Sequence, residues 1–148
     1  MTEVQVRRVA GGTYVARGPI NHWVVMDTSK AEAGHEGASA PMELVLMALG
    51  GCTGIDVELM LRKMRILVDD FRIEVSGERA DSPPRVYTTI EVAYHFWGRD
   101  LPRNKLERAV DLSHETYCSV ANMLKQVATL TTSIVVHDEI APNLPPVP

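Results

Sequence analysis

The sequence is poor in cysteine, in aromatic residues and in long uncharged apolar runs. It holds 2 cysteines, Cys52 and Cys118, among 148 residues, and aromatic residues make up 5%. The cysteines stand 66 positions apart (118 − 52), without a CxxC motif and without a nearby histidine at ligand spacing. This pattern predicts no metal site and no bound cofactor. In a reducing compartment it favours free or redox-active thiols over a structural disulfide.

Other absences exclude further classes of partner. The formal net charge is −4, so the chain has no general attraction to nucleic acid or to an anionic membrane. Residues 1–12 lack the apolar stretch of a secretory signal, which predicts a cytoplasmic protein. The uncharged run from Leu44 to Ile55 is well short of the ~20 residues that a bilayer requires, so no membrane span is expected.

The stretch from Ala40 to Arg65 predicts one long helix around which the fold is organised. Pro41 suits the first helical position, Glu43 complements the positive helix start, and basic residues at the far end complement the negative C-terminus. The residues between are apolar on every side, as in a helix buried by the rest of the fold and by a second subunit. Three glycines surround Cys52 in its middle, which lets another backbone or a substrate approach the thiol.

The other segments predict strands before and after this helix. Residues 4–26 predict short strands broken by turns at Gly11-Gly12 and Gly18-Pro19. Residues 27–39 predict a mobile polar loop, in which His35 is a solvated side chain. Apolar and polar residues alternate over Val68–Glu78 and Val86–Trp97, which predicts an antiparallel hairpin with one buried face.

The last third of the chain predicts two helices and a strand. Asp100 is a plausible cap for the first helix, which breaks near Thr116-Tyr117. The second helix would carry a core stripe of four residues: Val120, Met123, Leu124 and Val127. Residues 130–137 predict the final strand. The element order predicts an α+β fold built on antiparallel pairing, with a single domain over residues 1–140 and a proline-rich tail at 141–148.

Each cysteine has a redox and an inert interpretation. Cys118 falls at the start of the last helix, where free N–H groups and the helix dipole would lower the pKa of its thiol. Free cysteine is also among the most buried residue types, so an inert core thiol is the alternative at both positions.

Two motifs carry a resemblance to a known family. The run PMELVLMALGGCTGIDV surrounds Cys52, and SHETYCSVANML surrounds Cys118. Together with GRDL after the second long strand and with the element order, they resemble the OsmC/Ohr family of thiol-dependent peroxidases, and in particular its YhfA-like subgroup. The resemblance covers nearly the whole chain.

The resemblance implies an intertwined homodimer, in which antiparallel sheets wrap around two long central helices and the active sites lie at the subunit interface. It implies that Cys52 is the peroxidatic thiol, which attacks the O–O bond of a small organic hydroperoxide and becomes a sulfenic acid. Cys118 would then resolve it as a disulfide, which an external dithiol reduces. We therefore expect the two cysteines to lie close together in the fold.

The long helix departs from the family pattern at its first turn. The family's glutamate directly follows the proline that opens the helix, and Met42 stands there in this chain. Glu43, one place further on, is the nearest substitute. On a straight helix, however, Glu43 lies opposite Cys52.

The first hairpin departs as well. The family's arginine, which would pair with the thiolate, follows a Gly-Gly, and the matching residue here is Thr13. Arg17 is the nearest arginine that would serve, and Arg7 and Arg8 are weaker candidates. With both family residues replaced, we expect slow peroxide turnover at neutral pH that rises with pH.

Two function classes therefore remain open. The first is a peroxiredoxin-like hydroperoxide reductase of the oxidative stress response, with Cys52, Cys118, Glu43 and Arg17 as its catalytic residues. The second is a non-catalytic small-molecule binding or thiol redox-sensing protein on the same fold. The retained cysteines favour the first class. Met42 and Thr13, in place of the family's glutamate and arginine, favour the second. The Asp56 carboxylate, four residues after Cys52, does not support a thiolate either, unless it is paired elsewhere.

Overall fold

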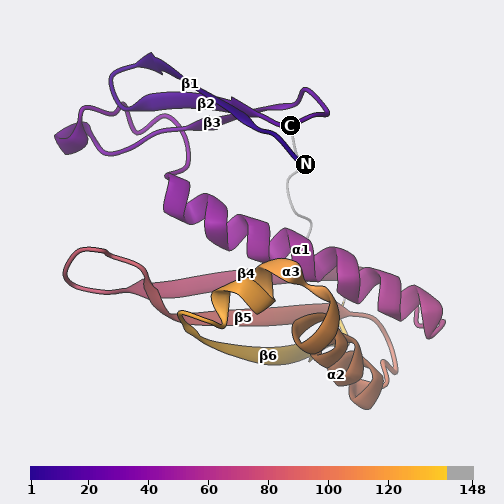
Figure 1. Cartoon of the computed structure of the whole chain (residues 1–148). Coiled ribbons are helices and arrows are strands. Elements are labelled where there is room, and N and C mark those ends of the chain that lie inside the picture. The colour runs from indigo at the N-terminus through magenta and orange to yellow at the C-terminus, as the bar shows by residue number, and fades with distance from the viewer. Residues whose placement is uncertain (140–148) are drawn as a thin grey trace. The chain divides into compact units, whose positions relative to one another are not determined.

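The computed structural model describes residues 1–139, which fall into two compact units, Met1–Val45 and a second unit that begins at Leu46. Figure 1 shows the elements in chain order. The predicted proline-rich tail, residues 141–148, lies outside the described residues. The single domain expected over residues 1–140 stays a prediction.

The first unit contains a three-stranded antiparallel sheet in the order β1-β2-β3. β1 (Gln5–Ala10) and β2 (Thr13–Arg17) meet at the Gly11-Gly12 turn, where Gly11 has a φ of 51° that glycine adopts with little strain. β3 (Trp23–Met26) follows the turn at Gly18-Pro19. The predicted short strands and the two turns between them are therefore confirmed.

A buried carboxylate organises the loop between β3 and the long helix. The carboxylate of Asp27 accepts hydrogen bonds from the backbone N–H groups of Gly37 at 3.0 Å and His35 at 3.1 Å. Backbone hydrogen bonds, that of Gly37 first, lower the pKa of Asp27 to about 2. The loop also contains the short 3-10 helix η1 (Lys30–Glu32). Hydrogen bonds thus hold a loop that its composition predicts to be mobile, and the exposed His35 pairs through Nδ1 with the hydroxyl of Thr13 at 2.9 Å.

Helix α1 (Pro41–Lys63) is the predicted long helix and has 23 residues. It begins at the expected proline. At its start, Glu43 Oε2 accepts a hydrogen bond from the backbone N–H of Ala40 at 2.8 Å, as in a capping box. The sequence therefore located both ends of this helix to within two residues.

The glycines of α1 let the helix approach the sheet of the second unit. A Cβ atom at Gly50 would lie 3.3 Å from Val75 Cγ2, and one at Gly54 would lie 3.0 Å from Ile73 Cδ1. By length and composition alone, α1 is long and apolar enough to cross a membrane. This close packing on β4 is instead what a core helix requires.

The sheet of the second unit has the order β4-β5-β6. β4 (Asp70–Arg79) and β5 (Tyr87–Trp97) form the predicted antiparallel hairpin. β6 (Thr129–His137) pairs with β5 in parallel register, which corrects the expectation of antiparallel pairing throughout. The predicted alternation of β5 is confirmed, because its inward side chains are fully buried: Ile90, Val92, Tyr94 and Phe96.

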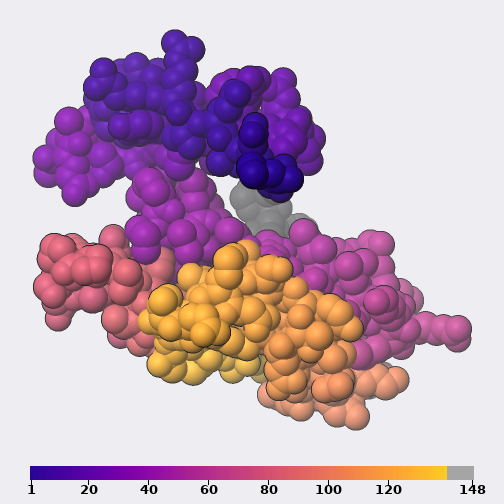
Figure 2. All heavy atoms as spheres, in the orientation of Figure 1, coloured from indigo at the N-terminus to yellow at the C-terminus, as the bar shows by residue number. Residues whose placement is uncertain are grey.

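A helical crossover makes the parallel pairing possible, since parallel neighbours cannot be joined by a tight turn. It consists of α2 (Arg103–Leu112), η2 (Ser113–Tyr117) and α3 (Ser119–Leu124). η2 is a π-helical turn, so the break predicted near Thr116-Tyr117 is confirmed. No side chain caps α2, so the capping role predicted for Asp100 is wrong. In Figure 2 the atoms of the crossover (orange) lie beside those of the C-terminal part of α1 (magenta).

The last helix is shorter than predicted and buries a different face. α3 ends at Leu124, so the residues after it no longer share its helical periodicity. Met123 and Val127, both predicted in the core, are exposed. Cys118 and Ala121 are the buried residues at this point of the chain.

Candidate active site

The structure brings the two cysteines together. Cys52 lies in the middle of α1, and Cys118 is the residue that caps the start of α3. Their sulfur atoms and a carboxylate oxygen of Asp56 all lie within 4.8 Å of one another. Both thiols are free. The prediction that the cysteines lie close together despite their separation in sequence is therefore confirmed.

The π-helical turn η2 positions Cys118. The backbone N–H of Cys118 donates to the carbonyl of Ser113 at 2.8 Å. The carbonyl of His114 accepts from Lys125 Nζ at 2.6 Å and from Asn122 Nδ2 at 3.4 Å. These bonds satisfy carbonyl groups that the end of a helix leaves unpaired. They thereby hold the chain where it turns from α2 toward the thiols.

The two thiols differ in their exposure to solvent. Cys52 is half-buried, whereas Cys118 is 0% exposed. Burial, followed by a hydrogen bond with the Cys52 thiol, raises the pKa of Cys118 to about 11. The backbone N–H of Ala121, which donates to Cys118 Sγ at 3.4 Å, opposes this shift. The predicted lowering of the Cys118 pKa is wrong, because the loss of solvation outweighs the hydrogen bond at the helix start.

A chain of buried polar groups lies next to the thiols. Thr53 Oγ1 is 2.6 Å from the hydroxyl of Tyr94 and 2.9 Å from Ser113 Oγ. The Tyr94 hydroxyl is in turn 2.5 Å from His114 Nε2. Ser113 Oγ donates to Asp56 Oδ2 at 3.3 Å. Side chains from α1, β5 and η2 thus connect the carboxylate beside the cysteines to a buried imidazole.

The buried groups nearest the His114 imidazole are uncharged. Burial, followed by the charge of Lys125, lowers the pKa of His114 to about 4, and Asp111 opposes the shift. Burial also raises the pKa of Tyr94. At neutral pH His114 is therefore a neutral imidazole, which is 5% exposed. Its Nδ1 atom is buried and has no hydrogen-bond partner among the described residues.

The sequence indicated part of this site and missed part. Cys52, Cys118 and Asp56 stand out by residue type and spacing. Tyr94 is one of the buried side chains of β5, so the pattern of the strand marks it as a core residue and does not single out its hydroxyl. The available signal for His114 was its place four residues before Cys118, within the motif SHETYC.

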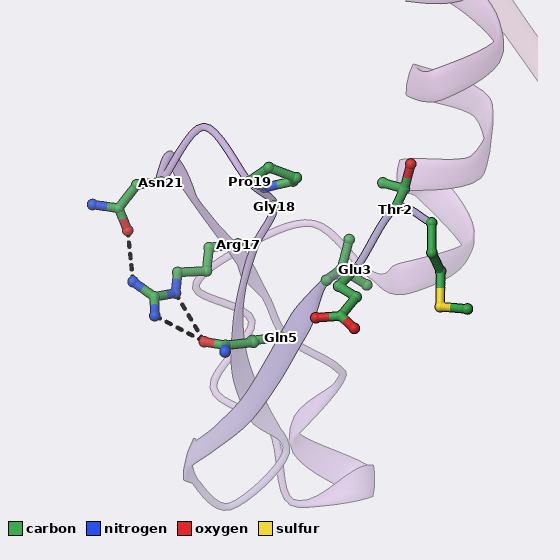
Figure 3. A pocket seen from close by; sticks show the side chains of 9 residues that line it. Thr2, Glu3, Gln5, Arg17, Gly18, Pro19 and Asn21 are labelled. Atoms are coloured by element: carbon green, nitrogen blue, oxygen red, sulfur yellow. Dashed lines mark hydrogen bonds between the residues drawn. The ribbon is translucent and has the colours of Figure 1, made fainter.

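Glu43 and Arg17, the other two predicted catalytic residues, lie in the first unit and have partners there. The Arg17 guanidinium donates to Gln5 Oε1 at 2.9 and 3.0 Å and to Asn21 Oδ1 at 2.6 Å, and it lies 5.2 Å from the Trp23 ring centroid. Figure 3 shows it between Gln5 and Asn21, at a pocket lined by N-terminal residues. Glu43 accepts a backbone N–H at the start of α1. Their part in activating a thiol stays a prediction.

Thr13, the residue at the expected position of the family's arginine, supports the loop before α1. Its hydroxyl donates to Asp27 Oδ1 at 3.2 Å and also pairs with His35 Nδ1. Thr13 thus has a structural role in this chain.

These observations define an α+β protein with two free, adjacent thiols between a long helix and a helical crossover. The family model described as OsmC-like protein matches residues 34–133. The protein YhfA of Escherichia coli is 40% identical over 131 residues, which cover 88% of this chain and 95% of that protein. The chain therefore belongs to the OsmC-like protein family.

Solved structures have the same fold. A hypothetical protein from Aquifex aeolicus is 31% identical, with a TM-score of 0.77 over 93% of this chain and 98% of that chain. The organic hydroperoxide resistance protein OhrB of Bacillus subtilis is 18% identical, with a TM-score of 0.64 over 91% of this chain and 98% of that chain. At that identity the second likeness shows the fold alone. The fold and family expected from the resemblance are thus confirmed.

Proposed function

We propose that the chain is a thiol-dependent peroxidase that reduces small organic hydroperoxides in the cytoplasm. Cys52 is the attacking thiol and Cys118 is the resolving thiol. The observation that carries the proposal is the pair itself, a half-buried sulfur within 4.8 Å of a fully buried one. A half-buried sulfur is open to a small peroxide, whereas the buried one needs only to reach its neighbour. OhrB of Bacillus subtilis, which shares the fold, is an organic hydroperoxide resistance protein, and this suggests the substrate class to test.

The reaction proceeds in three steps. The Cys52 thiolate attacks one oxygen of R–O–O–H, so that an S–O bond forms and the O–O bond breaks. Cys52 becomes a sulfenic acid, and the departing alkoxide takes up a proton and leaves as the alcohol. The Cys118 sulfur then attacks the sulfenic sulfur, which forms the disulfide and releases water. An external dithiol reduces the disulfide by thiol–disulfide exchange.

Asp56 is positioned to assist the second step. Its carboxylate oxygen lies within 4.8 Å of both sulfurs, within reach of the Cys118 proton through one water. The hydrogen bond from Ser113 Oγ orients the carboxylate. Asp56 would therefore act as the base that removes the Cys118 proton as the S–S bond forms.

The test is peroxide consumption by the reduced protein with excess dithiothreitol, using an organic hydroperoxide and hydrogen peroxide in parallel. The wild type should consume the organic hydroperoxide over many turnovers and faster than hydrogen peroxide. Cys52→Ser should reduce the rate to that of dithiothreitol alone, because the chain then lacks its accessible thiol. Wild-type protein alkylated with iodoacetamide is the chemical control. A Cys52→Ser variant that is as active as the wild type would refute the assignment.

A thiol redox sensor or non-catalytic binding protein is the second candidate. The raised pKa of Cys118 favours it, because a protonated resolving thiol slows the closing of the cycle. So do Met42 and Thr13 at the positions of the family's glutamate and arginine. A non-catalytic binding protein would consume no peroxide beyond the background of dithiothreitol alone. A sensor, whose disulfide dithiothreitol also reduces, would consume peroxide no faster than an ordinary free thiol does. The same assay therefore separates the two functions.

We also propose that the protein is a homodimer, as the resemblance implies. Three large apolar side chains of α1, Met47, Ile55 and Leu59, are exposed in the single chain, with Ile55 63% exposed. Exposed apolar surface of this kind on a central helix marks a protein interface.

Light scattering in dilute solution should therefore give the mass of two chains. Ile55→Asp with Leu59→Asp should weaken dimerisation more than a hundredfold, because each apolar side chain contributes about 1.5–3 kcal/mol when buried. Lys105→Glu, on an exposed position of α2, is the matched control and should leave the dimer intact. A stable, well-folded monomer in the wild type would contradict this proposal.

A further inference from the structure

The thiol pair and its neighbouring carboxylate have the composition of a metal site. Cys52 and Asp56 stand one helical turn apart on α1, and Cys118 meets them from the start of α3. Their three ligand atoms lie within 4.8 Å of one another, and this is the only such cluster of histidine, cysteine and acidic side chains found among residues 1–139. We propose that the reduced protein binds one thiophilic divalent cation, such as Zn²⁺, through these three side chains.

The distances fit tetrahedral coordination with small movements. At a Zn–S bond length of about 2.3 Å, two thiolates on a tetrahedral ion lie about 3.8 Å apart. The separation of the two sulfur atoms in the structure, at most 4.8 Å, exceeds this by no more than about 1 Å. Rotations about the side-chain bonds of Cys52 and Asp56 cover such a difference. The linear spacing of the cysteines gave no sign of this site, because its ligands meet only in the fold.

The ligand set predicts the kind of ion and of coordination. Two thiolates select soft or borderline ions such as Zn²⁺ and Cd²⁺ over Mg²⁺ or Ca²⁺, which prefer oxygen alone. Three protein ligands leave a fourth position for water or for a further ligand, as in catalytic rather than structural zinc sites.

A buried hydroxyl supports the carboxylate ligand. Ser113 Oγ donates to Asp56 Oδ2 at 3.3 Å and is itself 2.9 Å from Thr53 Oγ1. Both hydroxyl-bearing side chains are fully buried, so the donor is held in place. Supporting hydrogen bonds of this kind orient metal ligands and contribute to affinity.

Metal binding and oxidation of the thiols exclude one another. Two metal-bound thiolates and R–O–O–H, with two protons, would give the disulfide, the alcohol, water and the free cation. A bound ion would therefore protect the thiols from slow oxidation and would be released once they are oxidised. Binding itself requires only reduced thiols, so it does not depend on peroxide turnover.

The experiment is a titration of the full-length reduced protein with Cd²⁺ under anaerobic conditions. The thiolate-to-cadmium charge-transfer absorbance should saturate at one ion per chain, and competition with a chromophoric chelator gives the affinity. Cys52→Ser and Cys118→Ser should each lose about half of the absorbance. Asp56→Asn should keep the full absorbance, because both sulfurs remain, but should bind at least about tenfold more weakly.

Two controls make the result specific. Glu115→Gln removes an exposed carboxylate of η2 outside the cluster and should bind as the wild type does. The wild-type disulfide should not bind Cd²⁺ and should regain binding on reduction, which tests the thiol ligands even if a variant fails to fold.

Several outcomes would overturn the proposal. Asp56→Asn that binds as tightly as the wild type would remove the carboxylate from the site, and saturation at half an ion per chain would place the ion between two chains. The two proposals fail separately. A wild type that binds Cd²⁺ but shows no peroxide turnover would refute only the peroxidase function, and a wild type that turns over peroxide but does not bind Cd²⁺ would refute only the metal site.

Discussion

The Cys118→Ser variant should react with one equivalent of organic hydroperoxide and then stop. Cys52 should remain as a sulfenic acid, because the chain holds no third cysteine and a serine hydroxyl does not displace water from a sulfenic sulfur. In the wild type, the same treatment should give an intramolecular Cys52–Cys118 disulfide. Mass spectrometry separates the two products, since the variant gains oxygen and the wild type loses hydrogen. Trapping with dimedone identifies the sulfenic acid.

Two results would contradict the roles assigned to the cysteines. If Cys118→Ser turns over at the wild-type rate with dithiol present, the dithiol reduces the sulfenic acid directly and Cys118 is not the resolving thiol. If the wild type forms a disulfide between two chains, the intrachain contact of Cys52 and Cys118 is not the reactive one. Thiols that stay reduced at exposures that oxidise an ordinary free thiol would indicate inert core cysteines.

The resolving step should depend on pH when Cys118 has to lose its proton before it attacks, as in an Asp56→Asn variant. With a pKa of about 11, the thiolate fraction of Cys118 is small at neutral pH and grows about tenfold for each pH unit below that value. Sequential mixing, which forms the sulfenic acid at low pH and then raises the pH, would isolate this step. The rate should rise with pH in Asp56→Asn and should be flat between about pH 6 and about pH 9 in the wild type, where Asp56 removes the proton within the step. A wild-type rate that rises as steeply as that of the variant would refute this role of Asp56.

The regular elements of this fold could be predicted because their signals are local. Pro41 and the basic end of α1 mark a helix whose length needs no tertiary information. The alternation of β5 marks its buried face in the same way. The pairing of β6 could not be predicted, because the direction in which a strand joins a sheet depends on the crossover and not on the strand itself.

The candidate site was harder to predict, because its chemistry depends on burial. The local sequence places Cys118 at a helix start, which favours the thiolate. Residues distant in sequence bury the thiol, however, and burial raises its pKa by more than the helix start lowers it. Tyr94 and His114 show the same limit. Their polar atoms form a hydrogen bond between residues that are 20 positions apart in the chain, and the sequence around either residue does not predict this contact. The proximity of the cysteines came from the family resemblance and not from their spacing.

The buried imidazole of His114 should make stability fall in mild acid. Its pKa is about 4 in the folded protein against 6.5 for an ordinary histidine. Between these values the unfolded chain binds a proton that the folded chain does not, so the free energy of unfolding rises with pH across this window. The stability that the neutral imidazole contributes is therefore lost as the pH falls from 6.5 to 4. At about 1.4 kcal/mol per pKa unit, the loss approaches about 3 kcal/mol.

His114→Gln should remove most of this dependence. Glutamine offers a hydrogen bond to the Tyr94 hydroxyl but does not titrate, so the variant should be less stable than the wild type at neutral pH and should lose little more by pH 4. Urea unfolding at a series of pH values measures this directly, at one fixed protein concentration because the proposed dimer would contribute to stability. The exposed His22→Gln is the control and should follow the wild-type curve. Asp27 contributes only at lower pH, as its carboxylate is protonated between 3.8 and about 2. If wild type and His114→Gln fall in parallel between pH 6.5 and 4, the acid sensitivity belongs to other groups and the imidazole is not held neutral by burial.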